Sequence, residues 1–194
     1  MRFIKAILSI FAVSALYVQA AQLAQANSIP QQQNLLARKD MATLDTTSVI
    51  TVGDIQKINR EVEAIIDQRD VEGVLEYMAP FIISESITES SNASESVYIE
   101  GIEQHREMLT SVFNEAESDE NLNTQEISRK ESIRVTPDGQ LATAVISTVS
   151  EVTTDDELRL ITTTDTIRFA RLQGEVKVIF YTTDSQITSH ALQD

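Results

Sequence analysis

Residues 55–80, IQKINREVEAIIDQRDVEGVLEYMAP, limit the possible folds of this chain more narrowly than any other segment does. The segment predicts an amphipathic helix that begins near Thr51, whose side chain is suited to cap it. Asp70 interrupts the apolar stripe and can cap a second, short helix, which Pro80 is expected to end. The stripe of the first helix falls at helical spacing on Ile55, Ile58, Val62, Ile65 and Ile66.

A further helix and several strands are expected after this segment. FIISESIT at residues 81–88 and VYIEG at residues 97–101 have the composition of strands. A third helix is expected at residues 102–116, because its apolar side chains again follow a helical period. Four longer strands rich in Val, Ile and Thr complete the chain, at about residues 124–136, 141–153, 158–172 and 176–187.

The connections between the four last strands are short. Turn sequences lie at residues 137–139 (Pro-Asp-Gly), 155–156 (Asp-Asp) and 173–174 (Gln-Gly). Short connections favour antiparallel neighbours. The chain is therefore predicted to have an α+β fold, in which about three N-terminal helices pack on one face of a curved antiparallel sheet.

The N-terminus has the pattern of an export signal. Arg2 and Lys5 precede an apolar run from Ile7 to Val18, and small residues follow it. This pattern predicts a cleaved signal peptide, cut after Ala20 or Ala26, and a periplasmic or secreted protein. An uncleaved membrane anchor is the alternative, although the run is short for a bilayer. The expected organisation is a signal peptide at 1–26, a flexible tether at 27–53, one domain at 54–188 and a tail at 189–194.

Composition excludes several classes of partner and cofactor. The chain has 30 acidic and 15 basic residues, and loss of the signal peptide would remove two of the basic ones. Such a surface repels nucleic acid and anionic membranes, so neither is expected as a partner. With no Cys and two His, neither a disulfide nor a zinc site is expected. The chain also lacks a phosphate loop, a nucleophile elbow and a dinucleotide fingerprint, so no cofactor is expected.

Three segments together resemble one known family. They are IDQRDVEGVLEYMAPFII at 66–83, GIEQHREMLTSVF at 101–113 and TTTDTIRFARLQGEVKVIFYTTDSQI at 162–187. Their sequence and order are similar to those of the NTF2-like superfamily, a cone-shaped α+β fold that includes SnoaL-like proteins and ketosteroid isomerases. The resemblance covers about residues 54–188. It implies a cavity between the helices and the concave sheet, and a homodimer formed through the exposed sheet face. It implies no single activity, because this fold hosts both enzymes and binding proteins.

The ketosteroid isomerase pattern is only partly present. In that pattern a tyrosine lies on the first helix, an aspartate base on the first strand and a protonated aspartate on a later strand. Counted from Asp70, the tyrosine position falls on Val62 and the base position on Ser86, beside Glu85. Only Asp165 matches the third position. Isomerase chemistry of that type is therefore not expected.

Asp165 and His105 are the main candidates for a functional site. Asp165 shares strand parity with apolar residues, so its carboxyl is expected to lose water and to favour the neutral, hydrogen-bond-donating form. Alternatively, it pairs with a neighbouring arginine, Arg159 or Arg168, or faces solvent. His105 lies on the apolar stripe of the third helix, where it either fills the edge of the core or forms an acid/base pair with Asp165 or Glu85.

Two functional hypotheses follow from these residues. The first is a non-catalytic exported domain that binds a small apolar or amphipathic ligand in the cone, or that acts as a dimeric interaction module. Asp165 and His105 would then contact the ligand, with Tyr77 and Tyr98 near the mouth, although packing is an alternative role for Tyr77. The second is a small lyase- or isomerase-like enzyme that uses Asp165 with His105 or Glu85. We expect the first.

Overall fold

The computed structural model describes residues 49–90, 93–118, 123–153 and 157–191. The predicted signal peptide, most of the predicted tether and the Asp155-Asp156 turn lie outside these residues. In this part of the chain three helices and six strands follow one another: α2 (Val52–Asp67), α3 (Val71–Glu76), β1 (Met78–Glu89), β2 (Ser94–Glu100), α4 (Gly101–Ser118), β3 (Asn123–Val135), β4 (Leu141–Thr153), β5 (Glu157–Leu172) and β6 (Glu175–Ala191).

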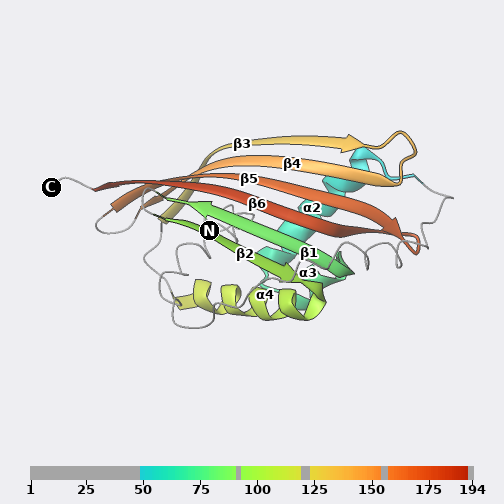
Figure 1. Cartoon of the computed structure of the whole chain (residues 1–194), viewed down its shortest axis with the longest axis horizontal. Helices are drawn as coiled ribbons and strands as arrows, with labels where there is room; N and C mark the ends of the chain where they lie inside the picture. The colour runs from blue at the N-terminus through green and yellow to red at the C-terminus, as the bar shows by residue number, and fades with distance from the viewer. Residues whose placement is uncertain (1–48, 91–92, 119–122, 154–156, 192–194) are drawn as a thin grey trace.

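The six strands form one curved sheet in the order β2-β1-β6-β5-β4-β3. Strands β3 to β6 form an antiparallel meander, and the β1–β2 hairpin joins its β6 edge. Figure 1 shows all three helices on the same side of the sheet. The predicted α+β architecture is therefore confirmed. One pairing differs from the antiparallel expectation: β1 and β6 are parallel, because no short turn joins these two strands.

The hinge between α2 and α3 has the predicted capping chemistry. The Thr51 side chain accepts a hydrogen bond from the Asp54 amide, and the Asp54 side chain accepts one from the Thr51 amide. The Asp70 side chain caps α3 by accepting from the Gly73 amide at 3.0 Å. The prediction that Pro80 ends the second helix was wrong. The second helix ends at Glu76, and Pro80 lies in β1 where the pairing with β6 shifts register, so its missing amide hydrogen disrupts no regular ladder.

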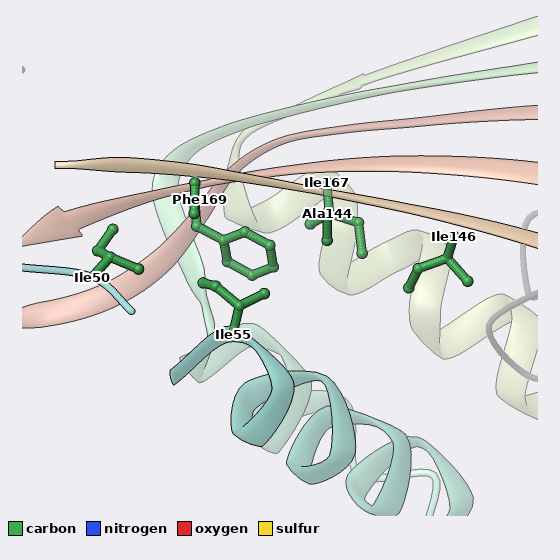
Figure 2. Packing of buried hydrophobic residues seen from close by; sticks show 7 residues of the cluster. Ile50, Ile55, Ala144, Ile146, Ile167 and Phe169 are labelled. Atoms are coloured by element: carbon green, nitrogen blue, oxygen red, sulfur yellow. The ribbon is translucent and has the colours of Figure 1, made fainter. Parts of the chain in front are cut away.

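Most of the buried apolar side chains in the described ranges belong to three clusters. The first joins the helices, through Ile66, Val74, Leu75, Leu109, Val112 and Phe113. The second joins the N-terminal half of α2 to one end of the sheet, and Figure 2 shows Ile55 opposite Phe169 with Ile50 beside them. The third is small and consists of Val152 and Ile161, with Ile187 packed against them. The sheet is therefore apolar at both ends of its strands.

The folded domain extends beyond both predicted boundaries. Ile50, placed in the tether by the sequence, is 2% exposed, and its amide donates to the Gly139 carbonyl at 2.7 Å. Gly139 has φ +67°, and a Cβ there would lie 2.4 Å from the Val49 Cβ, so a glycine is needed at this contact. At the other end, β6 continues through Ala191 into the predicted tail. None of the helices in the described ranges is long and apolar enough to cross a membrane.

Candidate functional site

The sheet face toward the helices, which we call the inner face, is polar in its middle. Burial alternates along β4, so that Ala142, Ile146 and Thr148 point inward while their sequence neighbours are half-exposed. Between the two apolar ends of this face lies a set of buried polar side chains that we call the polar belt: Ser84 and Ser86 of β1, Thr148 and Ser150 of β4, Thr163 and Asp165 of β5, and Thr183 and Ser185 of β6.

The strand register brings these residues together. Asp165 is paired with Thr183 of β6, which is itself paired with Ser86 of β1. One step further along the strands, Thr163 is paired with Ser185 on one side and with Thr148 on the other. Paired residues on neighbouring strands have adjacent side chains on the same face. The polar belt is thus a continuous band across four strands.

Asp165 lies at the centre of the polar belt and is 1% exposed. Its Oδ1 accepts hydrogen bonds from the Tyr181 hydroxyl at 2.6 Å and from the Thr183 hydroxyl at 2.7 Å. Burial raises the pKa of Asp165 to about 6, although these two hydrogen bonds and the charge of Arg129 act in the opposite direction. Burial beside this carboxyl also raises the pKa of Tyr181, so the phenol remains a donor.

Three hydroxyls of the polar belt have no hydrogen-bond partner within the described structure. They belong to Ser150, Thr163 and Ser185, and all three side chains are buried. Leaving a buried hydroxyl unpaired costs about 1–3 kcal/mol, so such groups are uncommon and indicate a bound water or ligand. Apart from Asp165, the polar belt therefore offers at least three free hydrogen-bonding groups.

His105 is 1% exposed and joins α4 to β1. Its Nδ1 lies 2.7 Å from the Gly101 carbonyl oxygen, and its Nε2 lies 2.9 Å from Ser84 Oγ. Because a carbonyl only accepts, Nδ1 carries the proton and Nε2 accepts from the Ser84 hydroxyl. Burial lowers the pKa of His105, which favours this neutral form. Both ring nitrogens are therefore engaged with partners other than Asp165.

The remaining candidates lie elsewhere. Glu85 is exposed and, by strand parity, lies on the outer face of the sheet, where it is paired with Tyr98. Tyr98 is 49% exposed. Tyr77 follows α3 and donates to Glu61 of α2 at 3.3 Å. The structure thus places Asp165 and His105 on the inner face but does not bring Glu85, Tyr98 or Tyr77 into contact with them.

The positions compared with the isomerase pattern also have clear locations. Val62 packs against the helical cluster. Ser86 is buried in the polar belt, in the same row as Thr183 and Asp165. Sequence reasoning overlooked Tyr181 and Thr183. Their alternation with Ser185 in YTTDS, at residues 181–185, was the available signal.

An ion pair and a hydrogen bond connect α2 to the inner face of β3. Arg129 Nη2 lies 2.6 Å from Glu63 Oε1, and Asn59 donates to Glu131 at 2.7 Å. Arg129 is paired in register with Thr148, so it lies at one end of the polar belt. Across the described ranges, no group of three or more His, Asp or Glu side chains is placed to hold a metal ion.

Comparison with known proteins finds similarity of structure only. No family model matches the sequence, and no curated protein matches it. An NTF2-like protein of unknown function from Pseudomonas putida KT2440 has a TM-score of 0.49 at 15% identity, covering 71% of this chain and 89% of that one. A ketosteroid isomerase-like protein from Erwinia carotovora atroseptica SCRI1043 has a TM-score of 0.45 at 12% identity, covering 69% and 94%. The CaMKII hub of S. rosetta has a TM-score of 0.49 at 13% identity, covering 69% and 95%.

The element order and the sheet of this chain are those of an NTF2-like α+β cone. Two helices come first, α4 follows the β1–β2 hairpin, and the meander β3 to β6 closes the chain, with the helices on the inner face. The fold implied by the sequence resemblance is thus present. This fold hosts both enzymes and binding proteins, so the fold alone assigns no role to the chain.

Proposed function

We propose that this chain is a non-catalytic domain whose polar belt binds a small amphipathic ligand. The observation that carries this proposal is the set of three unpaired hydroxyls of Ser150, Thr163 and Ser185, buried in one band around Asp165. A ligand that hydrogen-bonds to these groups would remove their desolvation cost.

The surroundings of the polar belt support an amphipathic ligand. Two residues of the second apolar cluster flank Asp165: Ile146 is its partner on β4, and Ile167 lies two residues further along β5. Ile161 of the third cluster lies two residues before Thr163. A ligand on the belt would therefore contact apolar side chains along the strands on both sides. Binding sites of this composition, apolar with a few polar groups that fix orientation, are the usual kind for small molecules.

The contacts of His105 and Glu85 support a non-catalytic role. General acid/base catalysis needs a second group within hydrogen-bond reach of the reacting atoms. His105 is engaged with Ser84 and Gly101, and Glu85 is on the outer face. The lyase- or isomerase-like alternative retains one favourable observation, namely that the pKa of Asp165 is about 6, close to the working range of a general base.

A fluorescence titration with 2-naphthol, a fused aromatic ring with one hydroxyl, tests the binding proposal. The variant with Thr163→Val and Ser185→Ala removes two unpaired hydroxyls and should weaken binding about tenfold, since each hydrogen bond contributes about 0.5–1.5 kcal/mol. The matched control carries Thr110→Val and Ser94→Ala, which remove two exposed hydroxyls of α4 and β2. Equal affinities for the two variants, or no binding by the parent protein, would contradict the proposal.

We also propose that the outer face of the sheet forms a homodimer. Figure 1 shows the helices on the other side of the sheet, and the outer-face residues Thr162, Thr164 and Thr166 are exposed or half-buried. Light scattering during gel filtration should give the mass of two chains. Thr166→Arg should give one chain, whereas Thr110→Arg, an exposed position on α4, should leave the dimer intact. A single-chain mass for the parent protein would refute this part.

Export remains a third element of the proposal. It is supported by the charged start, the short apolar run and the small residues that end at Ala20 and Ala26. The intact mass of the protein recovered from the periplasm or the medium should correspond to a chain that begins at Ala21 or Asn27. A full-length chain in the membrane fraction would favour the uncleaved anchor instead.

A further inference from the structure

Among the described residues, no cation forms a salt bridge with the buried carboxyl group of Asp165. Both of its hydrogen-bond donors, Tyr181 and Thr183, are neutral hydroxyls, and both reach the same oxygen, Oδ1. Its other oxygen, Oδ2, receives neither of these bonds. A buried carboxylate is normally compensated by a paired positive charge. The hydrogen bonds from Tyr181 and Thr183 therefore do not neutralise the negative charge of an ionised Asp165.

Arg129, whose charge acts on Asp165, already forms an ion pair with another carboxylate. Arg129 acts on Asp165 through its charge, but its Nη2 lies 2.6 Å from Glu63 Oε1. Glu131 of β3, which accepts from Asn59, and Glu126, which is paired with Ser150, also lie on the inner face, and His105 of α4 is neutral there. Arg159 of β5 has the strand parity of Asp165 and is paired with Val152, so it is a second cation on this face. Together with Asp165 and the Arg129–Glu63 pair, these groups comprise four carboxyls and two guanidinium groups, so the charge near the polar belt is negative on balance.

The free hydrogen-bonding groups beside Asp165 are acceptors as well as donors. Thr163 lies two residues away on the same strand face, and Ser185 is its register partner. The hydroxyl oxygens of both are unpaired. Together with the carboxylate of Asp165 they place acceptor oxygens at three neighbouring positions of one face. A primary ammonium group has three N–H donors, whereas an alcohol has one and a carboxylate has none.

We propose that the ligand of the polar belt is a small primary amine with an apolar body, whose ammonium group binds Asp165 Oδ2 with Thr163 and Ser185. This inference deepens the binding function proposed above and rests on it. The charge-assisted bond to Asp165 sets the charge of the ligand, and the apolar residues Ile161 and Ile167 contact its body. The acidic balance of the chain, 30 acidic against 15 basic residues, also attracts cations toward the protein.

The amine should bind most tightly when Asp165 is ionised. Because burial holds the pKa of Asp165 at about 6, the carboxyl is mostly charged at pH 7.5 and mostly neutral at pH 5. The ammonium ion keeps its charge over this interval. The preference for an amine should therefore be present at neutral pH and be lost in acid.

Three probes of nearly equal shape test the charge of the ligand by calorimetry on the full chain. They are 1-naphthylmethylamine, 1-naphthylmethanol and 1-naphthoate. At pH 7.5 the amine should bind at least about tenfold more tightly than the alcohol, and the carboxylate most weakly. At pH 5 the preference for the amine should fall by about fivefold or more.

Asp165→Asn and Glu85→Gln form the matched pair of variants. Asp165→Asn keeps the shape and one acceptor oxygen, so it should remove the preference for the amine while the alcohol binds within about threefold of its parent affinity. Glu85→Gln removes an exposed carboxylate on the outer face and should leave the preference unchanged.

The outcomes separate the two proposals. If the alcohol or the carboxylate binds as tightly as the amine at pH 7.5, or if Asp165→Asn keeps the preference, the amine inference is overturned while the binding function stands. If none of the three probes binds, both proposals fail. Tighter binding of the amine that depends on Asp165 and on pH supports both.

Discussion

Replacing Asp165 by Asn should make the protein more stable at neutral pH. Burial raises the pKa of this carboxyl from 3.8 to about 6 in the folded protein. At about 1.36 kcal/mol for each pH unit, this difference corresponds to about 3 kcal/mol. Between pH 3.8 and 6 the folded protein binds more protons than the unfolded chain, so the free energy of unfolding falls as the pH rises and then stays constant. Asn has no charge to desolvate, and its carbonyl oxygen can still accept from Tyr181 and Thr183.

The effect is measured by urea unfolding of the parent protein and of Asp165→Asn at pH values from 3.5 to 7.5. Other carboxylates titrate alike in both proteins, so the difference between the two isolates Asp165. From pH 3.5 to pH 7.5, the difference in the free energy of unfolding between the two proteins should change by about 2–3 kcal/mol in favour of the variant. Asp184→Asn, on the next strand but exposed on the outer face, is the control and should leave the pH dependence unchanged.

Two results would refute this reasoning. A stability difference that is independent of pH would mean that the Asp165 carboxyl is not desolvated in the folded protein. A difference of opposite sign, with the parent gaining stability as the pH rises, would mean that the Tyr181 and Thr183 hydrogen bonds outweigh burial. A variant that gains stability and loses amine binding would instead show that Asp165 is kept for binding rather than for folding.

Three further substitutions test other parts of the structure. Gly73→Ala should destabilise the fold by about 1–3 kcal/mol in denaturant melts, because the new Cβ would lie 2.6–2.9 Å from the Asp70 and Ile65 side chains, whereas Gly53→Ala has no contact closer than 3.7 Å and should be neutral or slightly stabilising. His105→Leu should cost about 1–3 kcal/mol by leaving the Ser84 hydroxyl unpaired, and the same change made in a protein carrying Ser84→Ala should cost less. Thr163→Val replaces an unpaired buried hydroxyl with a methyl and should raise the melting temperature by a few degrees; a lower one would mean that the hydroxyl has a partner after all.

The helices and most strand limits could be predicted from local sequence. Helical spacing of apolar residues located α2, and the Thr51 and Asp70 caps were visible as side chains next to that pattern. The strand predicted at 141–153 matches β4 residue for residue. These features depend on contacts within a few residues, which is why the sequence contains them. Pro80 misled the prediction because a proline stops a helix but also tolerates an irregular strand, and local sequence does not distinguish these uses.

Of the candidate site, the sequence predicted only the direction of side chains that alternation along a single strand gives. The parity of Asp165 with Ile161, Thr163 and Ile167 is a property of β5 alone, and it placed the carboxyl on the correct side of that strand. The outward direction of Glu85 follows in the same way from its place between Ser84 and Ser86, because neighbouring residues of β1 point to opposite faces.

What the sequence by itself determined is therefore the set of elements, their order, the alternation of faces along each strand and the antiparallel pairing of β3 to β6. Only the tertiary structure decided that the β1–β2 hairpin joins this sheet at β6. The parallel pairing of β1 with β6 joins segments about one hundred residues apart, and it aligns Ser86, Thr183 and Asp165 in one row. The same packing gave His105 its partner in Ser84 rather than in Asp165. Such contacts form because buried polar groups must find partners across the sheet, a requirement of the whole fold that no local pattern of residues records.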